Sequence, residues 1–280
     1  MKIGITGNKG FIGGSVGNLL LKENHDIVSL DDYTLSKTFG EKDKYNIPNE
    51  LEWVLHFGAS TSINRSFQNP FYTYNNNINS TLQALKVAHF SSASFIFMSS
   101  YVYGDPEYIP INEKHPLRAN NPYMGSKIIC EKICQDFSKQ FDIPLIILRA
   151  FNIYGDKIVK GRLISDLIHA VKNNEPLSIN DPFPKRDYLY IVDFMALIKK
   201  IISSKSPKIG TYNVGHGKSY SNLEVAKIIK DLAGGNLEIL INSNPRANDI
   251  IDCTVDTRMI RKTFLWEPKY SLKDGLAKLI

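Results

Sequence analysis

Residues 2–31 read KIGITGNKGFIGGSVGNLLLKENHDIVSLD, and this stretch decides the fold. A short apolar run over residues 2–6 leads into glycines at positions 7, 10 and 13, and a helical pattern then covers residues 11–23. A second apolar run, residues 26–30, ends at Asp31. The order strand, glycine turn, helix and strand predicts the first βαβ unit of a parallel sheet.

The same alternation continues to about residue 150. We expect further strands over residues 53–57, 94–99 and 145–150, an abbreviated strand at 45–47, and helices over 71–90 and 123–141. This pattern predicts an α/β fold with a doubly wound parallel sheet, the Rossmann arrangement. Beyond residue 155 the pattern is mixed, with helices predicted over 163–173 and from 193 and 222, and strands at 177–179, 188–191 and 211–214.

The domain prediction follows from this change of pattern. Residues 1–155 should form the Rossmann domain, to which later segments return, and residues 156–280 should form mainly a smaller α/β lobe interleaved with it.

Composition excludes several classes of protein. The chain has 280 residues, of which 43% are hydrophobic and 22% charged, an ordinary globular mixture. No run reaches the roughly 20 apolar residues of a membrane span. We therefore expect a cytoplasmic protein. The three cysteines form no CxxC pair and the six histidines show no ligand spacing, so we predict buried thiols and no metal site. The net charge of +6 comes without any nucleic-acid-binding module, so no nucleic-acid partner is expected.

The glycine turn and Asp31 together predict a dinucleotide site. Glycines let a phosphate approach backbone N–H groups at the positive end of a helix. Asp31 follows the last glycine by 18 residues, where a carboxylate binds an adenosine ribose. This carboxylate favours NAD, whereas the Lys9 ammonium suits a 2′-phosphate and keeps NADP as the alternative. The expected cofactor residues are Gly7, Lys9, Gly10, Phe11, Ile12, Gly13, Asp31, Phe57, Gly58, Ala59 and Lys127.

A tyrosine and a lysine on one helix supply candidate acid/base chemistry. Tyr123 and Lys127 are four residues apart, so they lie on one face of the predicted helix. A cation about 4 Å from a phenol favours its ionised form and lowers its pKa from ~10 toward neutrality. Ser99 ends a predicted strand at the edge where open parallel sheets bind ligands, so we expect it to donate to the reacting oxygen. His56 lies in an apolar run and is expected to be a hydrogen-bonded core histidine.

From end to end the chain resembles the extended short-chain dehydrogenase/reductase family, in its nucleotide-sugar epimerase/dehydratase branch. The motifs TGNKGFIG, VLHFGAS, SSYVYG, PYMGSK, LRAFNIYG, KRDYLYIVD and PRANDI resemble that branch's TGxxGFIG, VxHxAA, SSxxVYG, PYxxSK, LRxxNVYG, RDYxHVxD and RPGD. The resemblance implies Ser99, Tyr123 and Lys127 as the catalytic set. It also implies a homodimer formed through the helices over 71–90 and 123–141. A nucleotide-diphosphate sugar is the implied substrate, with Asn152, Arg186 and Arg246 on its diphosphate side. We also expect Ser100 and Arg162 to contact the substrate; for Arg162 the alternative is a surface charge at the start of a helix.

One departure from the branch narrows the expected reaction. Its dehydratases carry Asp and Glu directly after the catalytic Ser or Thr, where this chain has Ser100 and Tyr101. Dehydration is therefore disfavoured, because neither side chain replaces a carboxylate in proton transfer. What remains is hydride transfer at C4 of the sugar. We expect epimerisation, with NAD(P)H-dependent reduction of a 4-keto-6-deoxy sugar as the alternative and a non-catalytic dinucleotide-binding protein as a minor one.

Overall fold

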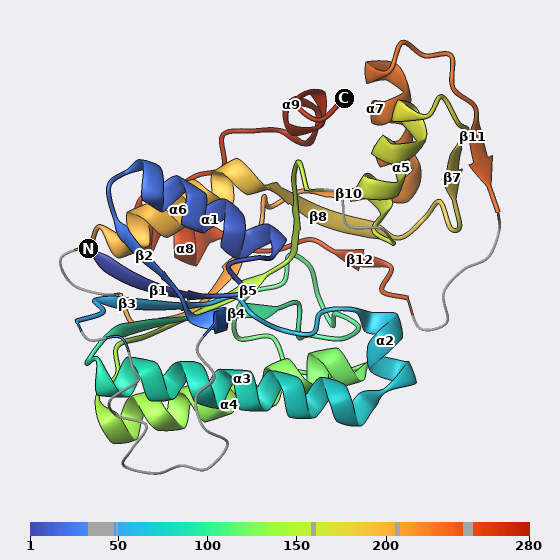
Figure 1. The fold of residues 1–280 in the computed structure, drawn as a ribbon. Helices are drawn as coiled ribbons and strands as arrows, with labels where there is room; N and C mark the ends of the chain where they lie inside the picture. The colour runs from blue at the N-terminus through green and yellow to red at the C-terminus, as the bar shows by residue number, and fades with distance from the viewer. Residues whose placement is uncertain (33–47, 49, 158–160, 205–207, 243–248) are drawn as a thin grey trace. The chain divides into compact units, whose positions relative to one another are not determined.

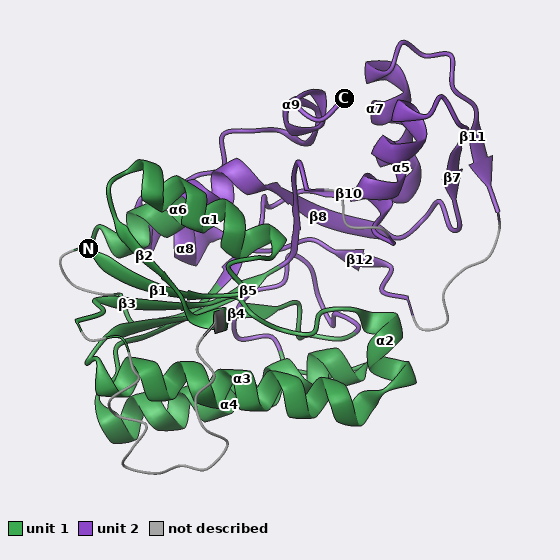
Figure 2. Cartoon of the chain, viewed as in Figure 1, with its two compact units in different colours: residues 1–104, 116–150, 197–212 green, residues 105–115, 151–196, 213–280 purple. Residues whose placement is uncertain are grey.

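The computed structural model describes residues 1–32, 48, 50–157, 161–204, 208–242 and 249–280. Within these ranges the chain divides into two compact units (Figure 2). The first comprises residues 1–104, 116–150 and 197–212, and the second comprises residues 105–115, 151–196 and 213–280. The residues expected to form a strand at 45–47 lie outside the described part of the chain.

A six-stranded sheet forms the centre of the first unit, in the order β2-β1-β3-β4-β5-β9. The pairings from β2 to β5 are all parallel. The order reverses between β1 and β3, which is the doubly wound arrangement, so the predicted fold class is confirmed. The strands are β1 (Lys2–Thr6), β2 (Asp26–Ser29), β3 (Trp53–His56), β4 (Ser94–Ser100), β5 (Leu145–Ala150) and β9 (Gly210–Val214).

Helices cover both faces of this sheet, with α1 on one face and α3 and α4 on the other (Figure 1). The helices are α1 (Phe11–Lys22), α2 (Ile63–Gln68), α3 (Pro70–Phe90) and α4 (Pro122–Phe141), and residues Leu30–Asp32 form a 3-10 turn, η1. Another helix, α6 (Ile191–Ile202), begins in the second unit and ends in the first.

Local sequence explains where α4 begins and ends. The Asn121 side chain accepts the Met124 N–H at its start, and Pro122 occupies the first turn, where a missing N–H costs nothing. The helix ends at Asp142, which adopts a left-handed conformation with φ of 51° before Pro144. These signals hold α4 in the register that places Tyr123 in its first turn.

The hydrophobic core of the first unit lies between the sheet and helices α3 and α4. Phe95 and Phe97 of β4 pack in one cluster with Cys130 and Cys134 of α4. All three cysteines are buried and free, as predicted. Along β4, therefore, the odd-numbered residues face α3 and α4 while the even-numbered ones face the opposite side. By this alternation, Ser99 faces α3 and α4, and Ser100 faces the opposite side of the sheet.

The second unit is built on β8, which pairs with β6 and β12 in parallel and with β10 antiparallel. Two short strands, β7 and β11, form a separate parallel pair. The strands of the second unit are β6 (Asn152–Tyr154), β7 (Leu177–Ile179), β8 (Lys185–Tyr190), β10 (Ser219–Ser221), β11 (Ile239–Ile241) and β12 (Asp252–Cys253). Its other helices are α5 (Leu163–Lys172), α7 (Asn222–Leu232), α8 (Arg258–Phe264) and α9 (Leu272–Ala277). No helix in the described ranges is long and apolar enough to cross a membrane.

Candidate active site

The loop between β1 and α1 is a tight glycine turn. Gly7 has a φ of +70°, and its carbonyl accepts the Gly10 N–H at 2.9 Å. A Cβ on Gly13 would lie 2.2 Å from the Gly7 carbonyl oxygen, so only glycine allows the helix to approach the loop this closely. Gly10 is the N-cap of α1 and offers no side-chain cap. The first-turn N–H groups of Phe11 and Ile12 are thus left to an external acceptor.

Asp31 lies directly beside this turn. Its carboxylate accepts the Gly7 N–H at 2.6 Å and, more weakly, the Lys9 N–H at 3.4 Å. The residue is exposed, so the remaining lone pairs of its two oxygens face solvent. The structure therefore brings the predicted ribose-binding carboxylate to the predicted phosphate-binding turn.

The chain after β3 runs against the same turn. A Cβ on Gly7 would come within 2.8 Å of the Gly58 backbone nitrogen, so the two loops are in contact. Phe57 donates its N–H to the Thr6 carbonyl at 3.3 Å, and Gly58 donates to the Thr6 hydroxyl at 3.0 Å. The predicted cofactor residues Phe57, Gly58 and Ala59 thus follow the strand next to β1.

His56 is a buried structural histidine, as predicted. Its Nδ1 lies 2.7 Å from the Thr6 hydroxyl and its Nε2 lies 3.1 Å from the Thr81 hydroxyl. Thr81 already donates to the Asn77 carbonyl, so its oxygen is free to accept and we assign the proton to Nε2. Burial, reinforced by the charge of Lys127, lowers the pKa of His56 to about 3. The ring is neutral at physiological pH and connects β1, β3 and α3.

Asn77 connects the loop after β3 to two helices. Its side-chain oxygen accepts the Ser60 N–H at 2.7 Å, and its amide nitrogen donates to the Ser60 carbonyl at 3.2 Å. The same nitrogen donates to the Ser126 hydroxyl of α4 at 2.9 Å. Asn77 therefore fixes this loop relative to the helix that carries Tyr123.

Tyr123 and Lys127 occupy successive turns of α4, as the sequence predicts. Tyr123 is half-buried, whereas Lys127 is only 3% exposed. The Lys127 Nζ donates to the Met98 carbonyl of β4 at 2.7 Å and lies 4.6 Å from the centre of the Phe97 ring. Burial lowers the pKa of Lys127 to about 8, although the neighbouring Glu131 acts in the opposite direction. Its ammonium is therefore a desolvated cation, one helical turn from the phenol.

The two serines at the end of β4 point to different faces of the sheet. Ser99 is buried and donates from Oγ to Glu131 Oε1 of α4 at 2.5 Å. This differs from the expectation that Ser99 serves the reacting oxygen, because its proton is already bound to a carboxylate. Ser100 is half-buried, and the hydrogen bond from its hydroxyl to the Tyr101 carbonyl is long, at 3.4 Å.

Sequence reasoning missed the group that accepts the Ser99 proton. Glu131 forms a two-pronged ion pair with Arg149 of β5, with Arg149 Nη2 2.7 Å from Glu131 Oε2. Both side chains are buried. Glu131 stands four residues after Lys127 and eight after Tyr123, so helical spacing alone places all three on one face.

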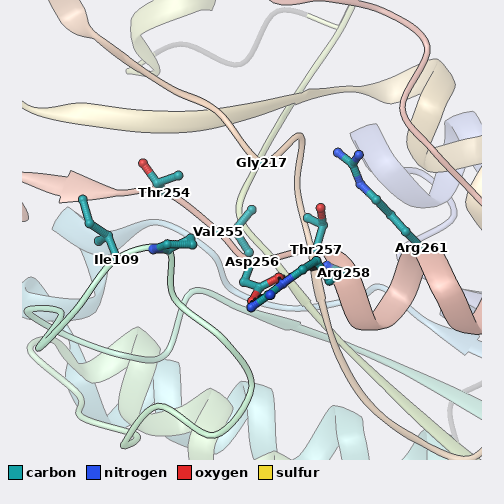
Figure 3. A pocket seen from close by; sticks show the side chains of 9 residues that line it. Ile109, Gly217, Thr254, Val255, Asp256, Thr257, Arg258 and Arg261 are labelled. Carbon is teal, nitrogen blue, oxygen red and sulfur yellow. Dashed lines mark hydrogen bonds and ion pairs between the residues drawn. The ribbon is translucent and has the colours of Figure 1, made fainter.

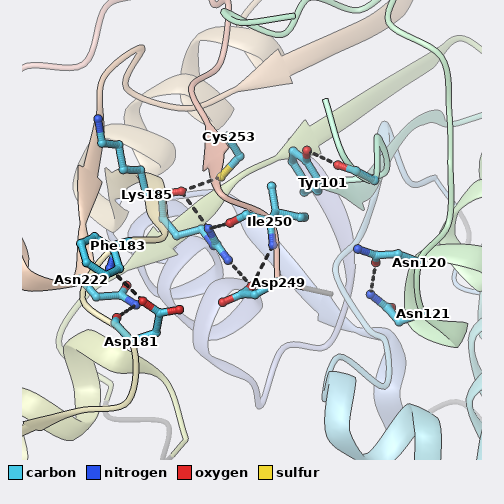
Figure 4. A network of polar contacts seen from close by, with 12 residues as sticks. Tyr101, Asn120, Asn121, Asp181, Phe183, Lys185, Asn222, Asp249, Ile250 and Cys253 are labelled. Carbon is cyan, nitrogen blue, oxygen red and sulfur yellow. Dashed lines mark hydrogen bonds and ion pairs between the residues drawn. The ribbon is translucent and has the colours of Figure 1, made fainter. Parts of the chain in front are cut away.

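Of the described residues predicted to bind substrate, Ser100 ends β4 in the first unit, whereas Asn152, Arg162 and Arg186 lie in the second. Asn152 starts β6 and donates to the Asp187 carbonyl at 3.2 Å. Arg186, on β8, is bound to a neighbouring segment, with Nη2 2.5 Å from Asp249 Oδ1 and Nη1 2.6 Å from the Ile250 carbonyl. Figure 4 labels Asp249 and Ile250, the two residues of that segment. The structure therefore places Asn152 and Arg186 on adjacent strands.

Of the two other predicted arginines, Arg162 does not lie on these strands. Arg162 is the exposed N-cap residue of α5. Arg246 lies outside the described residues, three positions before Asp249.

A buried carboxyl group organises this part of the second unit. Asp187 accepts the backbone N–H groups of His216 at 2.6 Å and Gly217 at 2.8 Å. Burial raises the pKa of Asp187 to about 7, while these N–H groups act in the opposite direction. Its contacts are all with backbone, which indicates a structural role.

A pocket of about 520 Å³ also lies in the second unit, lined by residues 109–110, 217, 254–258 and 261 (Figure 3). Arg258 reaches along its wall to Asp256, with which it forms an ion pair at 2.6 Å. None of the described site residues lines this pocket, so we do not assign the candidate site to it.

Sheet order, glycine turn and Tyr–Lys pair together define a dinucleotide-binding α/β protein. The chain belongs to the NAD-dependent epimerase/dehydratase family, whose family model matches residues 3–215. This confirms the resemblance seen in the sequence.

Individual relatives match nearly the whole chain. A putative UDP-glucose 4-epimerase of Methanocaldococcus jannaschii is 28% identical, over 99% of this chain and 96% of its own. UDP-glucose 4-epimerase from Bifidobacterium longum, solved with NAD+ and UDP, superimposes with a TM-score of 0.85 at 27% identity and covers 99% and 96% of the two chains. UDP-glucuronic acid 4-epimerase from Bacillus cereus, solved with UDP-glucuronic acid and NAD, gives 0.84 at 26% identity and the same coverage.

Proposed function

We propose that this protein is an NAD-dependent enzyme that inverts C4 of a nucleotide-diphosphate sugar. The observation that carries the proposal is the placement of Tyr123 and the desolvated Lys127 on α4, with the Lys127 Nζ bonded at 2.7 Å to the carbonyl of Met98, near the carboxyl end of β4. Membership of the family and the similarity to 4-epimerases of UDP-sugars support it.

The residues of the first unit fit a bound NAD. The uncapped start of α1 and the glycine turn suit a pyrophosphate, because backbone N–H groups point outward there. Asp31 has carboxylate lone pairs left for ribose hydroxyls and would repel a 2′-phosphate, which favours NAD over NADP. When bound, NAD supplies reversible acceptance of a hydride.

Tyr123 is the proposed proton acceptor and donor for the sugar hydroxyl. Its phenol lies in the first turn of α4, and the buried Lys127 ammonium favours the ionised form. Tyr123 would take the proton from the C4 hydroxyl as C4 is oxidised and return it as C4 is reduced. Because the same group works in both directions, the protein needs no external proton between the two half-reactions.

We assign the accompanying hydrogen-bond donor to Ser100. It is the last residue of β4, at the edge where open parallel sheets bind their ligands. Its hydroxyl can exchange a long 3.4 Å contact for a substrate oxygen, whereas Ser99 would have to leave a buried carboxylate.

The absence of a carboxylate at this strand end favours epimerisation over dehydration. Ser100 is followed by Tyr101 and Val102, and the Tyr101 hydroxyl donates to the Gly104 carbonyl at 2.5 Å. No group here matches the acid and base that removal of water requires. Reduction of a 4-keto sugar uses the same Tyr123 and Lys127, so it stays the second candidate.

Recognition of the nucleotide-diphosphate is proposed for the second unit. Arg186 stays cationic at any working pH and offers parallel N–H donors to a phosphate. Its ion pair with Asp249 fixes the guanidinium in place, at 19% side-chain exposure. Asn152, Arg162 and Arg246 remain proposed substrate-binding residues, as the sequence suggests.

A homodimer and a cytosolic location complete the proposal. Large apolar side chains are exposed on the paired helices α3 and α4, with Phe71 86% exposed. A second copy of the chain would cover them, which light scattering on the purified protein would detect as twice the monomer mass. The three free cysteines fit a reducing compartment.

One screen tests the function. Purified protein is incubated with NAD and UDP-, dTDP-, GDP- and CDP-hexoses, and in parallel with NADH or NADPH and the 4-keto derivatives of these sugars, while absorbance at 340 nm is followed. We expect a C4 epimer to accumulate from one hexose without net absorbance change, and Tyr123→Phe to lose that activity by at least 100-fold. Stoichiometric loss of NADH with a 4-keto sugar would establish the reductase instead, and full activity of Tyr123→Phe would contradict the acid/base assignment.

A further inference from the structure

The proposed acid/base pair continues into a third buried side chain. Tyr123, Lys127 and Glu131 follow each other at four-residue intervals and share one face of α4. Glu131 is 2% exposed. A buried carboxylate is unfavourable unless charges and hydrogen bonds compensate it, so its place behind the catalytic pair calls for an explanation.

Both Glu131 oxygens are fully engaged by side chains of the sheet. Arg149 donates from Nε to Oε1 at 3.0 Å and from Nη2 to Oε2 at 2.7 Å. Ser99 donates to Oε1 at 2.5 Å. Arg149 in turn donates from Nη1 to the Tyr103 hydroxyl at 3.1 Å. The cluster thus joins a helix, two strands and the segment that follows β4.

These contacts lie at the level of the active site rather than in the middle of the sheet. Ser99 and Arg149 are direct partners in the β4–β5 register, one residue before the strands end. Met98, whose carbonyl receives the Lys127 ammonium, immediately precedes Ser99. The loss of one hydrogen bond in this cluster would therefore disturb backbone within one or two residues of Ser100 and of the Met98 carbonyl that binds Lys127.

We propose that Glu131 is a positioning residue whose carboxylate, bound to Ser99 and Arg149, fixes α4 against the ends of β4 and β5. By holding Ser99 on the helix face, it directs the next side chain, Ser100, to the other face. By holding α4, it sets the positions of Lys127 and Tyr123. This inference rests on the proposed function of that pair.

Glu131 also acts on the charge of Lys127. The titratable groups that bear on this ammonium include Cys130, Cys134 and Glu131 on its own helix and His56 on β3. Tyr123, one turn before it on α4, and Arg149 of β5, which is bound to Glu131, are the other charged or titratable groups that the proposal involves. Burial favours the neutral amine, and the carboxylate of Glu131 opposes that effect. Without it, the uncompensated guanidinium of Arg149 would disfavour the ammonium further.

Glu131→Gln in the full chain with NAD tests the inference, because it keeps the shape and removes the charge. For the sugar nucleotide turned over in the screen above, we expect kcat to fall at least 30-fold with KM within threefold. The alkaline limb of kcat should move to lower pH by half a unit or more. The same shift should appear without substrate, in the titration of the ¹³C-labelled Lys127 side chain by NMR. Asp136→Asn, which changes an exposed carboxylate of the same helix, should change none of these values.

The outcomes separate this inference from the proposed function. If Tyr123→Phe is inactive but folded Glu131→Gln keeps kcat within twofold and an unshifted Lys127 titration, the positioning role is overturned. If Tyr123→Phe stays active, the acid/base role in the proposed function fails, while the Lys127 titration still decides on Glu131.

If Glu131→Gln does not fold, two further variants test the same inference. Glu131→Gln with Arg149→Met removes both charges, and we expect it to fold with kcat reduced at least tenfold. Ser99→Ala leaves both charges and removes one hydrogen bond, and we expect kcat to fall three- to tenfold at unchanged KM. Wild-type kcat in a folded double variant, or in Ser99→Ala if the double variant does not fold, overturns the inference.

Discussion

Replacing Lys127 by methionine should make the protein more stable and inactive at the same time. Burial moves the pKa of this lysine from 10.5 to about 8. The unfolded chain therefore binds the proton more tightly, and a charged Lys127 costs the folded state about 3 kcal/mol at neutral pH. Methionine has no such cost, but it loses the hydrogen bond to the Met98 carbonyl and the contact with the Phe97 ring, together worth about 1–2 kcal/mol. The net gain is about 1–2 kcal/mol, or roughly 3–6 °C in Tm.

The size of this stability gain depends on pH. The cost of the charged lysine is fully present below pH 8, and it is relieved as the pH rises from about 8 toward 10.5, because the folded protein then releases the proton first. Thermal and urea unfolding at pH 6, 7, 8.5 and 9.5 should show a stability advantage of Lys127→Met that shrinks at the two higher values. Lys132→Met, at an exposed position of the same helix, is the matched control and should show no pH-dependent difference. A Lys127→Met protein that is less stable than wild type at pH 7, with a gap independent of pH, would refute the description of Lys127 as a desolvated cation.

Three further changes have expected outcomes. Gly13→Ala places a methyl group 2.2 Å from the Gly7 carbonyl oxygen, so the turn must move. The affinity for NAD, measured by calorimetry, should fall at least 100-fold. An affinity within threefold of wild type would show that the turn does not hold the cofactor. Asp31→Ser removes the carboxylate beside the turn, and the ratio of NADP to NAD affinity should rise at least tenfold, whereas an unchanged ratio would place the ribose elsewhere. Arg186→Met should raise KM for the sugar nucleotide at least tenfold with kcat nearly unchanged. Asp249→Asn, which removes the charge of its ion-pair partner, should raise KM by a smaller factor. A loss confined to kcat would contradict a role of Arg186 in substrate binding.

Much of the first unit could be predicted because its signals are local. The alternation of apolar runs and helical patterns gave β1, α1, β5 and α4 to within one residue. Asn121 and Pro122 at the start of α4 and Pro144 after its end mark its limits by known capping and steric rules. The glycine turn and Asp31 were recognisable because their spacing along the chain is set by a single βαβ unit.

The direction of the serines was not available from the sequence. Residues 95–99 of β4 are buried on both faces, so the alternation of Phe95, Ile96, Phe97 and Met98 carries no polar side to reveal the phase. A shift of one residue exchanges Ser99 for Ser100 at the site. The partners of Ser99 come from an element 32 residues later and from a neighbouring strand, and only the fold brings them together.

Several short elements also escaped prediction. Strands β6, β10 and β12 have two or three residues each, too few to show a period of two. They exist because β8 supplies paired backbone on both of its edges. Arg186 was expected to face a phosphate, but its bond to Asp249 depends on the segment before β12 and could not be read from local pattern.

The most direct test of the proposed chemistry follows the hydrogen at C4. The sugar nucleotide identified by the screen is prepared with deuterium at C4 and converted by the protein with NAD in ordinary water. If the hydrogen leaves C4 as a hydride and returns to the opposite face, the epimer carries the deuterium at C4 and nowhere else. An epimer with solvent hydrogen at C4, formed at the same rate, would contradict the account.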